Sequence, residues 1–182
     1  MLNQISPLAP AQPKSEDAIA LLLGCHQRIR HFTGVAAKLA HAQAATPDEI
    51  AQAAAGVHRY YSVSLPLHEA DEEQTLQPRL AAVADDRVNH ALLAMSDQHQ
   101  AIEELMERLL PLLVMVKNNP DTLHAAGGEM CSITQALDEM FRAHLQMEEE
   151  VIFPAIRNLL PESARQEMLR EMQARRKPGV GN

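Results

Sequence analysis

The chain has 182 residues, of which 46% are hydrophobic and 22% charged, so we expect one folded domain rather than a disordered or collagen-like chain. Its formal net charge of −8 argues against a nucleic-acid partner, and the lack of an apolar run of about 20 residues argues against a membrane span. No basic region followed by an apolar block opens the sequence, and Cys25 and Cys131 fit reduced thiols, so we expect a cytoplasmic protein.

Most of the chain has apolar residues at helical spacing, and no segment has the alternating pattern of a β-strand. Residues 1–14 contain three prolines and are expected to form a flexible arm. Apolar residues then recur at steps of three and four in the stretches 15–45, 46–78, 86–117 and 121–160, each of which predicts a long helix. Residues 161–182 predict a short fifth helix, to about residue 175, and a loose tail. The expected fold is all-α: an up-down-up-down four-helix bundle over residues 15–160 with an additional short C-terminal helix.

Capping residues and prolines set the expected limits of the second helix. Thr46 and Glu49 have the spacing of a capping box, and Pro47 stands at the first helical position. We expect Pro66 to kink this helix without ending it, because the periodicity continues beyond it. Pro78 is expected to end the helix or to follow closely after its end.

Histidines and glutamates occur in a repeated order along the chain. His68 to Glu73 aligns with His144 to Glu149, 76 residues later, and in both segments a glutamate follows the histidine by four residues. His26 aligns with His99, 73 residues later. The first two predicted helices therefore look like a copy of the next two, which predicts a bundle with approximate two-fold symmetry.

Six residues of this repeat fall on helix faces that are expected to point inward. Residues four apart are neighbours on a helix face, so each histidine–glutamate pair forms one patch. Burying two carboxylates without a cation would be very costly, and a dinuclear metal site removes that cost. Nitrogen and oxygen ligands without thiolate suit Fe, Mn or Zn. We therefore predict metal ligands at His26, His68, Glu72, His99, His144 and Glu148.

Simpler interpretations exist for each of these residues taken alone. A single inward histidine is more often a hydrogen-bonded core residue than a ligand, and it is the doubled pattern that favours metal. A bundle whose histidines and glutamates pair without metal is disfavoured by the cost of burying the carboxylates. Glu73 and Glu149 lie about 100° round the helix from the predicted ligands, and we expect outward salt bridges for them rather than hydrogen bonds to ligand imidazoles. We expect Cys25 to be a small buried residue pointing away from His26.

The same residues, followed by Val151-Ile-Phe-Pro154, resemble a haemerythrin-like (HHE cation-binding) domain over roughly residues 15–160. This resemblance implies a non-haem di-iron centre inside a four-helix bundle. By similarity, His26 and His68 would bind one iron and His99 and His144 the other. Glu72 and Glu148 would bridge the two ions.

One position departs from the pattern of oxygen-carrying relatives. These have a second histidine four residues after the ligand of the third helix, and Glu103 stands there in this chain. We regard Glu103 as a candidate additional ligand that would favour Fe(III). The missing imidazole argues against reversible oxygen carriage and opens a coordination position for other small ligands.

Two functions remain open at this point. The chain could bind or sense O2, a related diatomic molecule such as NO, or iron itself. Alternatively, it could be a redox enzyme that acts on NO, peroxide or damaged iron–sulfur clusters. Relatives that repair clusters commonly carry an N-terminal segment with a cysteine, and residues 1–24 contain none. We therefore favour binding or sensing over catalysis and assign no oligomeric state.

Overall fold

The computed structural model describes residues 17–42 and 44–177, and the regular secondary structure within them is entirely helical, as expected. The predicted flexible arm and loose tail fall on residues outside these ranges. The helical elements, in chain order, are α1 (Ala18–Ala40), α2 (Pro47–Arg59), η1 (Tyr60–Ser64), α3 (Leu65–Asp71), η2 (Glu72–Leu76), α4 (Gln77–Ala81), α5 (Asp86–Asn118), η3 (Pro120–Thr122), α6 (Leu123–Met147), η4 (Glu148–Ile152), α7 (Phe153–Leu159) and α8 (Glu162–Arg175).

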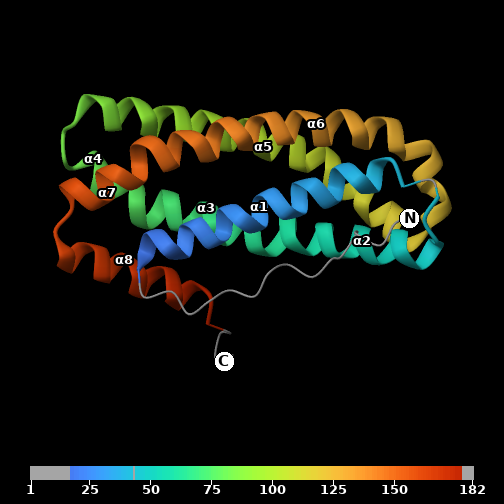
Figure 1. Cartoon of the computed structure of the whole chain (residues 1–182), viewed down its shortest axis with the longest axis horizontal. Helices are drawn as coiled ribbons and strands as arrows, with labels where there is room; N and C mark the ends of the chain where they lie inside the picture. The colour runs from blue at the N-terminus through green and yellow to red at the C-terminus, as the bar shows by residue number, and fades with distance from the viewer. Residues whose placement is uncertain (1–16, 43, 178–182) are drawn as a thin grey trace.

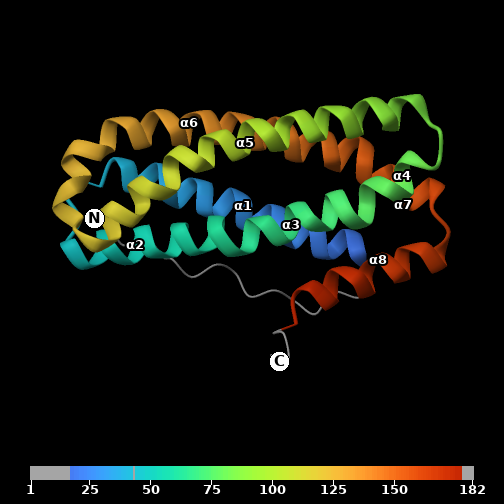
Figure 2. The same cartoon turned by 180° about the vertical axis from the view of Figure 1, so that it is seen from behind.

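The long helices lie side by side along the long axis of the molecule (Figures 1 and 2). α1 packs against α6 and α2, and α5 packs against α2 and α6. The last helix, α8, lies outside this group and rests against α1 and α3. It is held by a buried carboxylate, because Asp71 on α3 pairs with Arg175, at 2.8 Å, and with Arg176.

The helix starts follow the capping signals of the sequence. The capping box is present: the Glu49 amide donates to the Thr46 hydroxyl at 3.3 Å, and the Thr46 amide donates to the Glu49 carboxylate at 2.8 Å. α1 has Asp17 as its N-cap and ends at Ala40, short of the expected Ala45, because the chain needs the intervening residues to turn back before the Thr46 cap.

Three elements, η1, η2 and η4, are π-helical turns, and each is followed by a proline at the second position of the next α segment: Pro66, Pro78 and Pro154. Each turn is closed by a bond across five residues, such as the Gln77 amide to the Glu72 carbonyl. This shift of the bonding register accommodates a residue that has no N–H to donate. The expectation that Pro78 ends its helix is therefore wrong, and the helix continues to Ala81.

The interior contains two hydrophobic clusters with a polar layer between them. One cluster holds the second half of α1, α2, the second half of α5 and most of α6, with Ile29, Leu109 and Leu137 among its fully buried residues. The other holds the start of α1, α4, the start of α5, α7 and part of α8. The buried histidines and glutamates lie at the boundary between these clusters.

Candidate metal centre

Six buried side chains from different helices meet in the polar layer. His26 comes from α1, His68 from α3, His99 from α5 and His144 from α6, while Glu72 and Glu148 are the first residues of the π turns η2 and η4. All six are buried, and Glu72, Glu148 and His26 are 0% exposed. These are the six residues for which the repeat predicted an inward position, and the structure brings all of them together.

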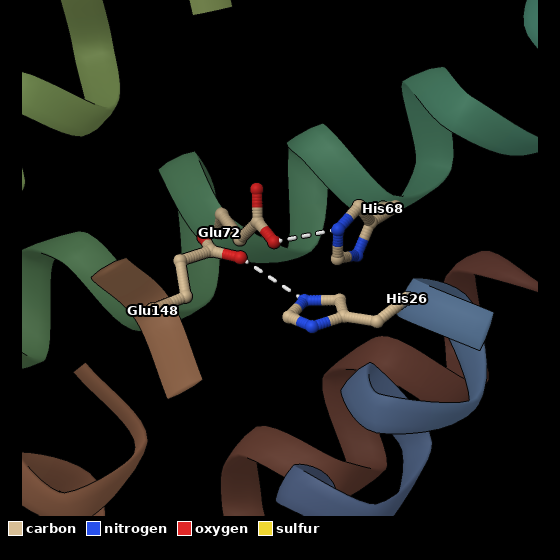
Figure 3. Close-up of side chains that lie close together, drawn as sticks. All are labelled: His26, His68, Glu72 and Glu148. Atoms are coloured by element: carbon tan, nitrogen blue, oxygen red, sulfur yellow. Dashed lines mark ion pairs between the residues drawn. The ribbon is translucent and has the colours of Figure 1, made fainter. Parts of the chain in front are cut away.

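The six residues form two groups that could each hold a metal ion. In the first, ligand atoms of His26, His68, Glu72 and Glu148 all lie within 4.8 Å of one another. In the second, the same holds for Glu72, His99 and His144. Figure 3 shows the first group, with the His26 and His68 rings facing the two carboxylates. Glu72 belongs to both groups, so one carboxylate connects the two candidate ion positions.

Each carboxylate directs its two oxygens toward different histidines. Glu72 Oε1 lies 2.9 Å from Nε2 of His68, and its Oε2 lies 3.1 Å from Nε2 of His99. Glu148 repeats this arrangement, since its Oε2 lies 3.0 Å from Nε2 of His26 and its Oε1 lies 3.6 Å from Nε2 of His144. Both carboxylates therefore extend from the His26–His68 pair to the His99–His144 pair.

The nitrogen and oxygen atoms of this layer are better placed to bind divalent metal ions than to form hydrogen bonds with one another. Nε2 of His26 and of His68, Oε1 of Glu72 and both oxygens of Glu148 are buried, and none has a well-directed hydrogen bond. Such groups are costly to bury unsatisfied. Imidazole nitrogens and carboxylate oxygens on opposite sides of a shared space are suitable ligands for two iron, manganese or zinc ions.

The pKa values of the two carboxylates are pushed in opposite directions. Burial opposes ionisation of Glu72, but the charge of His68 and hydrogen bonds from His68 and His99 hold the pKa of Glu72 well below its ordinary value. Burial, reinforced by the charge of Glu72, raises the pKa of Glu148 to about 7. Burial also lowers the pKa of His144 to about 3. The histidines alone therefore do not keep both carboxylates ionised, whereas two divalent cations would.

The outward nitrogens of three imidazoles have polar partners on neighbouring helices. His26 Nδ1 lies 2.8 Å from Glu149, His99 Nδ1 lies 3.3 Å from Glu73, and His144 Nδ1 lies 3.1 Å from the amide oxygen of Gln98. The preference for purely outward salt bridges at Glu73 and Glu149 is thus wrong, although Glu149 also pairs with Arg30. The helices cross closely enough for the residue after each central glutamate to reach a histidine of the next helix. Such contacts orient metal-bound imidazoles.

Of two further glutamates, Glu103 lies apart from the six residues and Glu69 lies close to one of them. Glu103 is exposed and is absent from the groups whose ligand atoms converge. Glu69, which sequence reasoning did not single out, is half-buried and lies 3.9 Å from Nδ1 of His99. Burial raises the pKa of Glu69. Its position directly after a predicted ligand is the signal that could have indicated it.

A small cavity of about 20 Å³ adjoins the second group. By volume it can hold one water molecule. Its lining combines polar residues of the site with four apolar side chains; these residues are His68, Glu69, Glu72, His99, His144, Ile29, Leu65, Ile102 and Phe141. The space is therefore next to the convergent group that has fewer members.

The thiol of Cys25 also reaches the site, which its angle to His26 on the same helix did not suggest. Cys25 is buried, as expected, and its thiol is close enough to His68 for the charge of that imidazole to act on it. Although burial opposes ionisation, His68, Arg176 and Arg28 together lower the pKa of Cys25 to about 7. The other cysteine, Cys131, lies 3.3 Å from Nε2 of His41 on a different part of the bundle.

Comparison with known proteins gives one match. Residues 17–156 match the family model described as Hemerythrin HHE cation binding domain. No curated protein and no solved structure matches the chain. Among the described residues, none of the helices has the length and apolar character needed to cross a membrane.

Proposed function

The chain belongs to the haemerythrin HHE cation-binding domain family, and from this premise we propose that it is a non-haem di-iron protein that binds or senses O2 or a related small molecule. The bundle that carries this centre is, in the proposal, an up-down-up-down four-helix bundle. We assign its six ligands to His26, His68, Glu72, His99, His144 and Glu148, and manganese or zinc could replace iron.

One observation carries the assignment of two ions. The two oxygens of Glu72 and the two oxygens of Glu148 each face one histidine of the His26–His68 pair and one of the His99–His144 pair. A carboxylate in this position can donate one oxygen to each of two cations. His26 and His68 would then complete one coordination sphere, and His99 and His144 the other.

The cavity supports a small neutral molecule as the exogenous ligand. It lies beside His99 and His144, where Glu72 completes the second convergent group, and Ile29, Leu65, Ile102 and Phe141 supply its apolar lining. Bound iron would supply a redox-active centre for O2 or NO at this position. The chain itself would restrict access by size and exclude bulk water, while Glu73, Glu149 and Gln98 orient the imidazoles.

Reconstitution with Fe(II) followed by elemental analysis and absorption spectroscopy tests this proposal. We expect two iron ions per chain and a spectrum that changes on exposure to O2 or NO, and a change that reverses when the gas is removed would favour binding or sensing. One ion or none after reconstitution would contradict the dinuclear assignment. Rapid conversion to a stable ferric form would instead favour the alternative function, a redox enzyme acting on NO, peroxide or damaged iron–sulfur clusters.

A further inference from the structure

We propose that Glu69, Glu73 and the outer nitrogen of His99 form a loading site, at which a divalent metal ion binds on its way into the centre. This inference rests on the proposed function, since it concerns how the proposed centre acquires its ions. The side chain of Glu73 is 48% exposed, that of Glu69 36% and that of His99 8%. Glu72, on the inner side of the same imidazole, is 0% exposed. The loading site therefore lies between solvent and the second convergent group.

The three residues converge on one point outside the centre. Ligand atoms of Glu69, Glu73 and His99 all lie within 4.8 Å of one another. Oε1 of Glu73 lies 3.3 Å from Nδ1 of His99, and Oε1 of Glu69 lies 3.9 Å from it. Two carboxylates and an imidazole are suitable ligands for Fe(II), Mn(II) or Zn(II). The loading site thus offers the same types of ligand atom as the centre, at a place that ions in solution can reach.

The internal repeat shows that a cation occupies the equivalent place in the other half of the bundle. There, Oε1 of Glu149 lies 2.8 Å from Nδ1 of His26 and accepts a hydrogen bond from Arg30, also at 2.8 Å. Glu149 is the repeat equivalent of Glu73. Arg30 is the repeat equivalent of Glu103, because each follows its aligned histidine by four residues. One half therefore supplies its own positive charge beside the outer glutamate, and the other half has a carboxylate at that position.

The half that contains His99 carries negative charge that no basic side chain compensates. Among the described residues, neither Glu69 nor Glu73 pairs with a lysine or an arginine, and the ion-pair partner of both is His99. Glu69 also stands at the repeat position of Leu145, which is 0% exposed in the other half. Two carboxylates thus replace a guanidinium and a buried apolar side chain, so this place suits a cation that comes from solution.

His99 and the adjoining cavity connect the loading site to the centre. Nδ1 of His99 faces the loading site, whereas its Nε2 lies 3.1 Å from Oε2 of Glu72. Glu69 also lines the cavity beside the second convergent group. Once a metal ion is bound to Nε2, the imidazole carries its proton on Nδ1 and donates it to Glu73, so Nδ1 is no longer a ligand. The loading site therefore binds an ion most strongly while the centre is empty.

Rates of Co(II) uptake by the metal-free protein test this inference, measured by stopped flow from the visible absorption of bound Co(II). Glu69→Gln removes a ligand of the loading site, and Glu103→Arg gives this half the basic residue of the other. We expect each to lower the second-order rate constant by about tenfold or more, because local negative charge speeds the arrival of cations. Both variants should still hold two ions at equilibrium, since they retain all six ligands. Glu104→Gln and Glu104→Arg make the same changes of charge at an exposed neighbour and should keep a rate close to that of the wild type.

Three results would overturn the loading site. The first is uptake by the Glu69 and Glu103 variants as fast as that of their Glu104 controls, and the second is an equal decrease in all four, which would indicate attraction by overall charge. The third is a lower equilibrium content in Glu69→Gln, which would make Glu69 a ligand of the centre itself. If Glu69→Gln does not fold, Glu103→Arg, at an exposed position, decides alone. Wild-type protein that takes up no Co(II) would overturn the proposed function as well, whereas unchanged rates in the variants overturn only this inference.

Discussion

The carboxylate of Glu149 lies 2.8 Å from Nδ1 of His26, on the side of the ring that faces away from Glu148. Two consecutive glutamates of η4 therefore contact the two nitrogens of one imidazole. The inner contact belongs to the candidate metal centre, and the outer one fixes the ring and favours the tautomer that leaves Nε2 free to bind a cation.

Glu149→Ala should therefore weaken metal binding without removing a ligand. We expect the affinity to fall by about 10–100-fold while the saturated protein still holds two ions. Isothermal titration with Zn(II) measures both quantities. Glu150→Ala is the matched control, since Glu150 is exposed and bonds only to Gln146 on its own helical stretch among the described contacts. Equal affinities for the two variants would contradict an orienting role for Glu149.

Substitution of either central carboxylate should empty the whole centre. Because Glu72 and Glu148 each face both histidine pairs, Glu72→Ala or Glu148→Ala removes charge compensation from both ions, and we expect the metal content to fall toward zero rather than to one. Glu103→Ala changes an exposed carboxylate and should retain two ions. Elemental analysis after reconstitution checks this difference. An empty Glu103 variant beside a filled Glu72 variant would reverse the assignment.

Metal removal should lower the stability of the fold and its cooperativity. The ligands come from all the long helices and lie between the two hydrophobic clusters, so bound ions connect the two halves of the core. We expect the melting temperature to fall by roughly 5–10 °C when the metal is stripped. Calorimetry should also show a broader transition in the metal-free protein. Superimposable transitions would favour a bundle whose polar layer is held without metal.

Metal affinity should rise with pH up to about neutrality. Burial raises the pKa of Glu148 to about 7, and the Glu72 carboxylate helps to raise that of His68, so both groups carry protons in the metal-free protein at lower pH. Metal binding displaces these protons, and the affinity therefore falls as the pH decreases below about 7. Zn(II) titrations in buffers of different ionisation enthalpy measure the number of protons released. A constant affinity between roughly pH 5.5 and 7.5 would contradict this coupling.

The buried Asp71 should anchor α8 to the bundle. Its pairing with Arg175 and Arg176 satisfies a carboxylate that is 0% exposed. Asp71→Ala removes these charged hydrogen bonds and should cost about 1.5–3 kcal/mol in the free energy of unfolding, measured by urea denaturation. Arg170→Ala is a suitable control on α8, because the side chain of Arg170 is exposed.

The helices and their inward faces could be predicted because hydrophobic periodicity and capping residues are local signals. His26, Ile29 and Thr33 are all buried on the predicted stripe of α1, and the His-x-x-x-Glu pairs meet as the repeat predicted. Contacts between helices could not be predicted in this way. Glu149 reaches His26 and Gln98 reaches His144 only because neighbouring helices lie close together at that level, and no spacing within one helix encodes this.

The π turns were not predicted either. In each copy of the repeat, they set the direction in which the residues after the turn point, relative to the histidine before it. Leu76 and Leu80 follow His68 by eight and twelve residues, as Ile152 and Ile156 follow His144. On a regular α-helix, at about 100° per residue, these positions would lie about 80° and 120° round from the histidine. A π turn absorbs about one residue and brings both to within about 20° of it.

One helix face can thus carry the polar residues of the candidate site and, further along the helix, aliphatic residues of the hydrophobic core. All four of these aliphatic residues are 0% exposed. The length of the segment between each central glutamate and the following proline therefore determines which type of turn is needed to keep one face inward, even where the residues within it point to solvent. Deletion of an exposed residue such as Gln74 would replace the π turn η2 by a regular α turn and leave Leu76 and Leu80 on the inward face, because they would then follow His68 by seven and eleven residues.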